Sequence, residues 1–180
     1  MIVLRVISGK YKGRKLDGFD IEGTRPTMDR VKESLFAMIQ DKVNGSIVLD
    51  LFAGSGALGI ETLSNGASKV YFVDNNKEIE KVLKKNLSGM EGYEVIINDY
   101  NKVLKMFRDN NQKFDIILLD PPYDRHFINK ILDFIYNNNL LKENGVIVTE
   151  YESEKVKSDN FHIYKERKYG SKIVTIFDMK

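Results

Sequence analysis

The chain contains no cysteine, and this absence removes several kinds of chemistry at once. It excludes a disulfide framework, a thiolate metal site and a cysteine nucleophile. No apolar run approaches the roughly 18 residues that cross a bilayer. The first residues also lack the charged and apolar regions of a secretory signal. We therefore expect a soluble cytoplasmic protein.

Proline is scarce, with three residues, and no repeat or low-complexity tract interrupts the 180 residues. Apolar residues make up 42% of the chain and charged residues 30%, which is the composition of a globular protein. This length suits one ordinary domain and is too short for two. We expect a single domain over 1–180, with an N-terminal extension and helix over 1–44 and a core over 45–180.

Histidine is also rare, and neither of its two copies, His126 and His162, has neighbours in the sequence that look like metal ligands. Both are more simply interpreted as structural or surface residues. Together with the absence of cysteine, this leaves no pattern typical of a transition-metal site. We therefore expect a protein that binds no metal.

Basic charge is concentrated at one end of the chain. The whole sequence has a formal net charge of +2, but residues 1–16 contain five basic residues and no acid, which leaves −3 for residues 17–180. The basic residues are Arg5, Lys10, Lys12, Arg14 and Lys15. Such a segment is typical of a surface that contacts phosphate groups, although a solvated basic arm has the same composition.

Short apolar segments alternate with amphipathic segments from residue 46 onward. The predicted strands are 47–51, 69–73, 94–97, 114–119 and 146–149. The predicted helices between them are 57–63, 78–87, 101–108 and 127–137. This alternation predicts an α/β fold, with a doubly wound, mainly parallel sheet and helices on both faces. Ligands bind such sheets beyond the carboxyl ends of the strands.

Two further regions flank this core. Residues 2–7 are predicted to form a strand, and a helix is expected after Thr27 because apolar side chains recur there at helical spacing. At the other end, 161–169 and 172–177 leave no room for a helix between them. They are predicted to form an antiparallel hairpin on the edge of the sheet, reached through a polar surface loop over 153–160.

A glycine loop lies between the first strand of the core and the helix that follows it. Gly54, Gly56 and Gly59 allow a sharp turn and a close approach of the backbone to a ligand. Their spacing, with Asp74 about twenty residues on, also fits a dinucleotide fingerprint. Asp50, however, is suited to meet a cationic ammonium group, which methionine supplies and a pyrophosphate would repel. We therefore interpret the loop as part of a site for S-adenosylmethionine.

Polar residues end the next two strands. Asp74 is placed to accept hydrogen bonds from both ribose hydroxyls of an adenosine, or else is an ordinary strand-end turn residue. Asn98-Asp99 either contacts the adenine amine or forms an Asn-Asp turn. The predicted cofactor-binding residues are Asp50, Phe52, Gly54, Gly56, Asp74, Asn75, Asn98 and Asp99. Glu150 ends the fifth strand and either lines the same site or is a buried strand-end acid.

The most informative motif is Asp120-Pro121-Pro122-Tyr123, at the end of the fourth strand. An exocyclic base amine is a poor nucleophile because its lone pair is delocalised into the ring. The Asp120 carboxylate and the Pro121 carbonyl, by accepting its two N–H groups, would aim that lone pair at a sulfonium methyl group. Two prolines stiffen the backbone, and Tyr123 can stack on an extruded base. The corner therefore predicts methylation of an exocyclic amine of a nucleic-acid base.

These motifs together resemble a known family. Residues 25–36, read with the glycine loop and the Asp-Pro-Pro-Tyr corner, are similar to the bacterial 16S rRNA guanine-N2 methyltransferase family, which belongs to the class I methyltransferases that use S-adenosylmethionine. The resemblance covers nearly the whole chain and departs from the family pattern at Ala37, where the family often has Asn. It implies that 120–123 hold the guanine amine and that Arg25 and Thr27 lie near the mouth of the active site.

The resemblance also implies 16S rRNA, or an assembly intermediate of the small subunit, as the partner. The residues predicted to bind this substrate are Arg5, Lys10, Lys12, Arg14, Arg25 and Thr27. We expect a monomer. A DNA adenine-N6 methyltransferase is the alternative, because such enzymes can carry the same Asp-Pro-Pro-Tyr motif. Only about 45 residues precede the core, however, and such an enzyme needs a sizeable extra region to recognise a DNA sequence. A catalytically silent RNA-binding protein and a dehydrogenase are the remaining hypotheses, and a cytosine-C5 enzyme is excluded if it needs a cysteine nucleophile.

Overall fold

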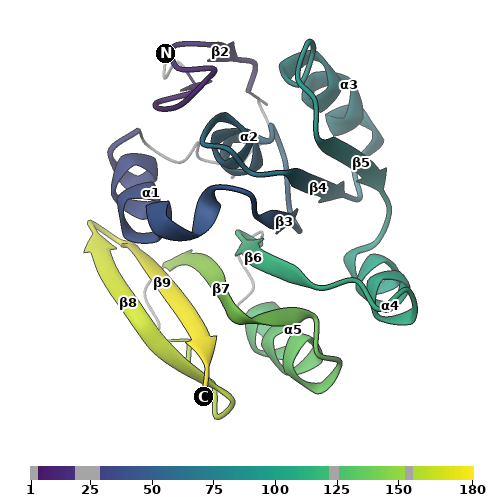
Figure 1. Ribbon diagram of the computed structural model, residues 1–180, viewed down its shortest axis with the longest axis vertical. Helices are drawn as coiled ribbons and strands as arrows, with labels where there is room; N and C mark the ends of the chain where they lie inside the picture. The colour runs from purple at the N-terminus through teal and green to yellow at the C-terminus, as the bar shows by residue number, and fades with distance from the viewer. Residues whose placement is uncertain (1–3, 19–28, 122–125, 153–155) are drawn as a thin grey trace.

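The computed structural model describes residues 4–18, 29–121, 126–152 and 156–180 (Figure 1). The predicted roles of Arg25, Thr27, Pro122 and Tyr123 fall outside these residues. The same is true of the first residues of the strand predicted over 2–7.

A seven-stranded sheet forms the centre of the fold. In chain order its strands are β3 (Ile47–Asp50), β4 (Lys69–Asp74), β5 (Tyr93–Ile97), β6 (Phe114–Leu119), β7 (Leu141–Glu152), β8 (Phe161–Tyr169) and β9 (Lys172–Met179). Their order in the sheet is β5-β4-β3-β6-β7-β9-β8. β3 to β7 pair in parallel, and β9 is antiparallel to both of its neighbours. The order reverses between β3 and β6, so the switch point at which α/β sheets bind ligands lies there.

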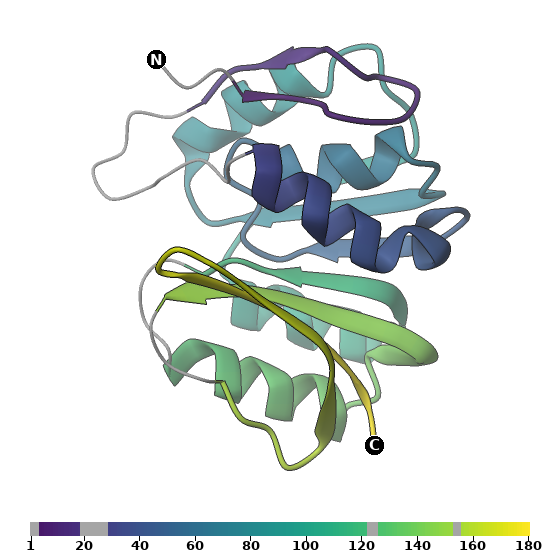
Figure 2. The ribbon, with the colours of Figure 1, turned by 90° about the vertical axis from the view of Figure 1, so that its left-hand side faces the viewer.

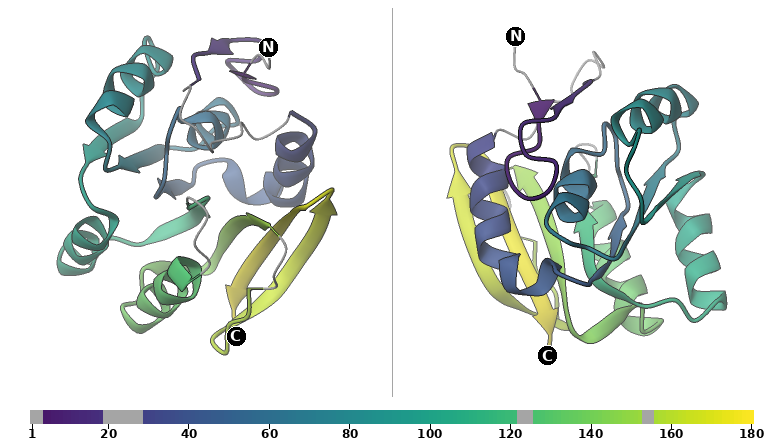
Figure 3. Two further views of the ribbon diagram at one scale, coloured as in Figure 1. Left: turned by 180° about the vertical axis from the view of Figure 1, so that it is seen from behind. Right: turned by 45° about the horizontal axis from the view of Figure 1, so that its top comes forward.

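Helices cover both faces of this sheet, as Figures 2 and 3 show. On one face lie α1 (Asp29–Val43), α2 (Ala57–Ser64) and α3 (Lys77–Asn86), and on the other lie α4 (Tyr100–Asp109) and α5 (His126–Asn137). Consecutive residues of β3 belong to different cores, because Val48 packs with α1 to α3 and Leu49 packs with α4 and α5. This period of two explains why the parallel strands are apolar on both sides.

Two helices begin at side-chain caps that directly follow strands. The Asn76 side chain accepts the N–H of Glu78 at 2.9 Å where α3 begins. The Asp99 side chain accepts the N–H groups of Asn101 and Lys102 at 3.0 and 3.3 Å where α4 begins. Such caps satisfy amides that have no partner within the helix. They fix the points at which the chain leaves the carboxyl ends of β4 and β5.

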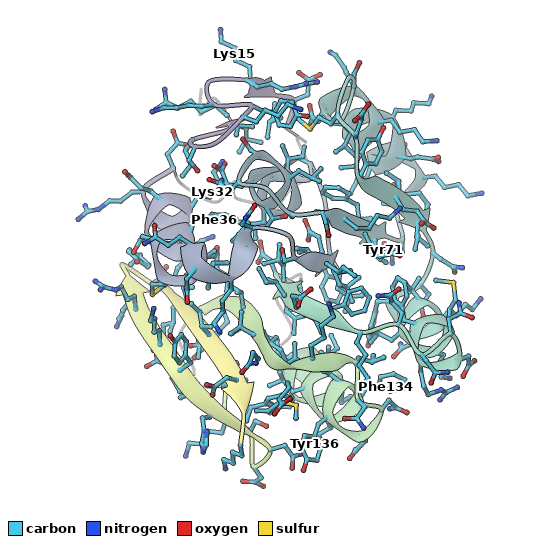
Figure 4. All side chains as sticks on the ribbon, in the orientation of Figure 1. Lys15, Lys32, Phe36, Tyr71, Phe134 and Tyr136 are labelled. Carbon is cyan, nitrogen blue, oxygen red and sulfur yellow. The ribbon has the colours of Figure 1, made fainter. Side chains whose placement is uncertain are left out.

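The N-terminal extension is a small antiparallel ladder of β1 (Leu4–Arg5) and β2 (Lys15–Leu16), which packs against α1 and α2 through Leu4, Val6 and Leu16. A buried charge pair holds it there. Lys32 on α1 lies 3.4 Å from Glu61 on α2, and Figure 4 shows Lys32 between the two helices. The backbone of the extension forms hydrogen bonds with both side chains of this pair, so the extension is tied to both helices.

The predicted strands and helices of the core are confirmed to within two residues, with two differences. The strand predicted over 146–149 is longer and forms β7 from Leu141 to Glu152. The strand predicted over 2–7 is shorter among the described residues, where β1 holds only Leu4 and Arg5. The C-terminal hairpin lies at the sheet edge, as expected.

Candidate active site

Four carboxylates lie in a row across the carboxyl ends of four adjacent strands. We call them the acid row: Asp74 on β4, Asp50 on β3, Asp120 directly after β6, and Glu150 on β7. The row spans the switch point of the sheet. It therefore occupies the place where this class of fold binds its ligands.

Strand register places these side chains on one face of the sheet. Asp50 is paired with Phe72 on β4 and with Leu118 on β6, and Leu118 is paired with Val148 on β7. The other three acids each follow one of these partners by two residues. Because side chains alternate with a period of two, all four acids point to the face that α1 to α3 cover.

Asp50 is the most deeply buried member of the row, with 3% of its surface exposed. Burial, and to a smaller extent the charge of Asp74, raise the pKa of Asp50 to about 7, while a hydrogen bond from the Gly59 N–H opposes the shift. That N–H lies 3.0 Å from Oδ2. It is the one hydrogen bond that the described residues give to Asp50. A buried carboxylate with remaining lone pairs is suited to bind a cation such as an ammonium group.

The glycines of the loop are required by close approaches and by backbone conformation. At Gly59 a Cβ atom would lie 2.8 Å from the carboxylate of Asp50 and 2.3 Å from the ring of Phe72. Gly54 and Gly56 have φ values of +52° and +81°, in the left-handed region that favours glycine. The loop therefore turns sharply between β3 and α2 and leaves the first amides of α2 beside the acid row.

Asp74 holds the loop in place. Its Oδ2 accepts the N–H of Gly54 and its Oδ1 accepts the N–H of Asn76, both at 3.0 Å. Each carboxylate oxygen has two lone pairs, so each keeps one acceptor position. Asp74 is thus both the strand-end turn residue and a carboxylate that can still receive two hydroxyl groups.

The next polar pair, Asn98 and Asp99, is largely engaged with its own backbone. Asn98 Oδ1 accepts the N–H of Asp99 at 2.9 Å, and the Asp99 side chain caps α4. Asn98 and Asn75 are exposed at the ends of β5 and β4. The turn interpretation of the Asn-Asp pair is confirmed for its hydrogen bonds, while contact with a cofactor stays a prediction.

An aromatic pair lies beside this end of the sheet. The ring of Phe52, which follows β3, is tilted against the ring of Tyr100, the first residue of α4, with centroids 5.4 Å apart. Both residues are half-buried. Phe52 is among the cofactor-binding residues predicted from the sequence and Tyr100 is not, although an aromatic residue directly after Asn98-Asp99 is a signal that points to it. Two aromatic rings therefore lie together where the chain leaves β3 and where α4 begins.

Asp120 is exposed to solvent, unlike Asp50. The surrounding protein nevertheless raises the pKa of Asp120 to about 7, through desolvation first and then through the charge of Glu150, with a smaller contribution from Asp50. Lys172 acts in the opposite direction. Part of the residue thus faces solvent, while the desolvation of its carboxyl group and the neighbouring acids disfavour the charged form. Near neutral pH it can therefore both accept and release a proton.

Glu150 is a buried acid that forms an ion pair with Lys172 on β9. The Glu150 side chain is 4% exposed and that of Lys172 is 19% exposed. From the sequence, Glu150 was either a residue that lines the site or a buried strand-end acid, and the structure places it in the acid row beside Asp120. Lys172 was not named as a site residue, because the antiparallel pairing that brings it there is a tertiary contact.

The predicted substrate-binding residues are spread along the N-terminal extension. Arg5 Nε lies 2.8 Å from Oδ2 of Asp29, at the start of α1. The N–H of Lys10 donates to the carbonyl of Ser64, the last residue of α2, at 2.7 Å. Because α2 has eight residues, this contact is about 12 Å further along the molecule than the glycine loop. The structure therefore does not gather these cations at one point. Arg5 lies beside the start of α1, Lys10 beside the end of α2, and Arg14 beside Ser88, which follows α3.

Two absences hold for the part of the chain that the structure describes. No group of three or more histidine or acidic side chains there is arranged to hold a metal ion. No helix in the same residues is long and apolar enough to cross a membrane.

The family model described as Conserved hypothetical protein 95 matches residues 4–178. The chain is similar to Ribosomal RNA small subunit methyltransferase D of Haemophilus influenzae, with 39% identity over 173 residues that cover 93% of this chain and 89% of that protein. The solved structure of yhhF from Escherichia coli superposes with a TM-score of 0.83 and 29% identity, covering 99% of this chain and 98% of that one. A more distant fold neighbour, SMU.776, was solved in complex with SAH; it has a TM-score of 0.61 and 18% identity and covers 79% of this chain and 49% of that one.

Proposed function

The chain belongs to the Conserved hypothetical protein 95 family, and from that premise we propose that it transfers a methyl group from S-adenosylmethionine to the exocyclic N2 amine of a guanine in 16S rRNA. The name of the Haemophilus influenzae relative supports small-subunit rRNA as the substrate. The observation that carries the proposal is the position of Asp120, beside Asp50 and the glycine loop at the switch point of the sheet.

The residues around the acid row fit S-adenosylmethionine. Asp50, a buried carboxylate with a single described donor, would receive the ammonium group, and Asp74 would receive the ribose hydroxyls. The aromatic pair of Phe52 and Tyr100 would lie against the adenine ring. When bound, the cofactor supplies a methyl group on a positively charged sulfur. The fold neighbour that holds SAH supports this assignment.

Asp120 and the carbonyl of Pro121 would hold the guanine amine through its two N–H groups. Both acceptors pull the nitrogen toward tetrahedral geometry, so that its lone pair is free for the methyl carbon. The nitrogen becomes positively charged as the new bond forms, and the acid row stabilises that charge. The nitrogen then loses one proton. The carboxylate of Asp120 is suited to take it, because its pKa of about 7 lies near the working pH.

The basic N-terminal extension would contact the phosphates of the RNA. Lys10, Lys12 and Lys15 are exposed. Arg14 is more constrained, because its Nη2 donates to the carbonyl of Ser88 at 2.6 Å. We propose that residues 1–180 form a single domain, in which residues 45–180 are the cofactor-binding and catalytic core. The proposal includes a monomeric cytoplasmic enzyme that acts on 16S rRNA or on a small-subunit assembly intermediate.

The experiment that tests this function is methyl transfer from labelled S-adenosylmethionine to 16S rRNA, to partly assembled small subunits and to duplex DNA. The methylated nucleoside is then identified by mass spectrometry. N2-methylguanosine in a ribosomal sample is the expected product. N6-methyladenine in DNA would favour a DNA adenine-N6 methyltransferase instead, and another base in rRNA would overturn the choice of amine.

A further inference from the structure

Lys172 ends the acid row with a positive charge. Its register places it there, because Glu150 is paired with Val174 on β9 and Lys172 lies two residues before Val174. The side chain of Lys172 therefore points to the same face as the acids. Lys172 thus adds a cation at one end of the acid row, next to Glu150.

Charged groups from three neighbouring strands act on Asp120. Glu150 on β7 and Asp50 on β3 raise its pKa, and Lys172 on β9 lowers it. Asp74 on β4 belongs to the row but lies one strand further away. Among the described residues, these are the charged side chains that the register brings to this face of the sheet at Asp120. The two members of the Glu150–Lys172 ion pair therefore have opposite effects on one carboxylate.

Stability alone does not account for a buried Glu150 at this position. A buried acid beside a second acid raises the cost of charging both, so a structural strand end would favour an apolar side chain. The same arrangement is useful if Asp120 must take up a proton. It favours the protonated form of Asp120, while the ion pair with Lys172 fixes the position of the second acid.

We propose that Glu150 and Lys172 are a positioning pair for Asp120: Glu150 prepares the substrate-binding carboxylate to accept a proton, and the ion pair with Lys172 holds the Glu150 side chain in place. This inference rests on the proposed function, which assigns the amine to Asp120. The nitrogen lone pair forms the bond to the methyl carbon, and the carbon–sulfur bond breaks with its electron pair staying on sulfur. One N–H proton of the positively charged nitrogen then passes to a carboxylate oxygen of Asp120 and from there to water. Glu150 and Lys172 are not consumed and form no covalent bond.

The direct test is a titration of Asp120 in the free protein, followed by carbon-13 NMR of labelled aspartate carboxyl groups. The Asp120→Ala variant identifies the resonance. Glu150→Gln should lower the pKa of Asp120, because it removes a like charge, and Lys172→Gln should raise it, because it removes an opposite one. Each change should be about one pH unit. A purely structural pair would leave the Asp120 titration unmoved, and that outcome would overturn the inference.

Two further variants keep this test decisive. Glu94→Gln is the matched control, because Glu94 on β5 pairs with Lys69 on β4 at 3.5 Å, outside the acid row, and it should leave Asp120 unchanged. If a single variant fails to fold, Glu150→Gln/Lys172→Gln removes both charges together. It should still lower the pKa of Asp120, by less than Glu150→Gln alone, because the effect of Glu150 exceeds that of Lys172. An unchanged or raised pKa in the double variant would contradict the inference.

The pH dependence of turnover provides the second readout. With whichever RNA the wild-type protein methylates, the acidic limb of kcat should move to lower pH in Glu150→Gln and to higher pH in Lys172→Gln. Equal losses of kcat with no movement of the limb would overturn the inference. The NMR titration needs no substrate, so it reports on the pair even if the guanine assignment proves wrong. The two proposals can therefore fail separately.

Discussion

Lys32 and Glu61 form an ion pair inside the protein, with Nζ and Oε2 3.4 Å apart and both side chains completely buried. Each charge has further partners in the N-terminal extension. Lys32 Nζ donates to the carbonyl of Arg5 at 2.5 Å, and Glu61 accepts the N–H groups of Ile7 and Ser8. The pair therefore joins α1, α2 and the extension at one point. It sets the position of the basic segment relative to the helix that begins at the glycine loop.

Lys32→Met should destabilise the fold strongly, because it leaves Glu61 buried with no opposite charge. The expected loss is about 3–5 kcal/mol in the free energy of unfolding, measured by urea denaturation. Lys84→Met is the control, since Lys84 forms an exposed pair with Glu80 at 2.6 Å, and it should cost no more than about 1 kcal/mol. Equal effects of the two variants would show that the buried pair does not hold the extension.

Asp74→Ala should weaken the binding of S-adenosylmethionine. The variant removes the acceptor proposed for the ribose and also the hydrogen bond to the Gly54 N–H that holds the loop. The expected loss is about 1–3 kcal/mol in binding free energy, measured by isothermal titration calorimetry. Asp115→Ala is a useful comparison, because Asp115 accepts the N–H of Ile47 at the opposite end of the sheet. Normal affinity in Asp74→Ala would remove the ribose assignment.

Neutralising Lys10, Lys12 and Lys15 together should weaken RNA binding and flatten its salt dependence. The slope of log affinity against log salt should fall by about 0.7–0.9 for each RNA phosphate that the variant no longer neutralises. A matched control neutralises three exposed lysines in and after α4, on the other face of the sheet: Lys102, Lys105 and Lys113. If the control changes the slope as much as the test variant, the extension is a solvated arm.

Asp50→Asn should stabilise the protein at high pH and have little effect at low pH. Burial raises the pKa of Asp50 from 3.8 to about 7, so the folded state holds a proton that the unfolded state has already lost. Stability is therefore lost as the pH rises from about 4 through 7. Since one pKa unit corresponds to about 1.4 kcal/mol, the gain at pH 8 is at most about 4 kcal/mol. Urea unfolding at pH 4 and pH 8 measures this difference, and an equal effect at both would refute it.

Much of the core was predictable because its information is local. Runs such as Ile116-Ile117-Leu118 and the helical repeats between the strands fix the type of each element. The glycine loop and the strand-end acids were also recognisable, because their chemistry depends on neighbouring residues. The carboxyl ends of parallel strands meet at one edge, so Asp50, Asp74 and Asp120 could be expected together.

The remainder depends on pairings between distant parts of the chain. Lys172 reaches the acid row only because β9 runs antiparallel to β7, and a hairpin predicted from turn residues does not fix that register. Lys32 carries no sign in the sequence that it will be buried, since a lysine at a helical position is usually solvated. Tyr100 acquires its environment from the ring of Phe52, which follows a different strand. In each case the tertiary context decides the environment of an ordinary residue.

The most direct test of the account is the single-turnover rate of methyl transfer to small-subunit rRNA by Asp120→Ala at saturating S-adenosylmethionine, measured beside its cofactor affinity. Losing one positioned acceptor should lower the rate by about 100- to 1,000-fold. Cofactor affinity should stay nearly unchanged, because Asp50, Asp74 and the glycine loop remain intact. A variant that transfers the methyl group at the wild-type rate would contradict the assignment of Asp120 to the substrate amine, and with it the proposed chemistry of the acid row.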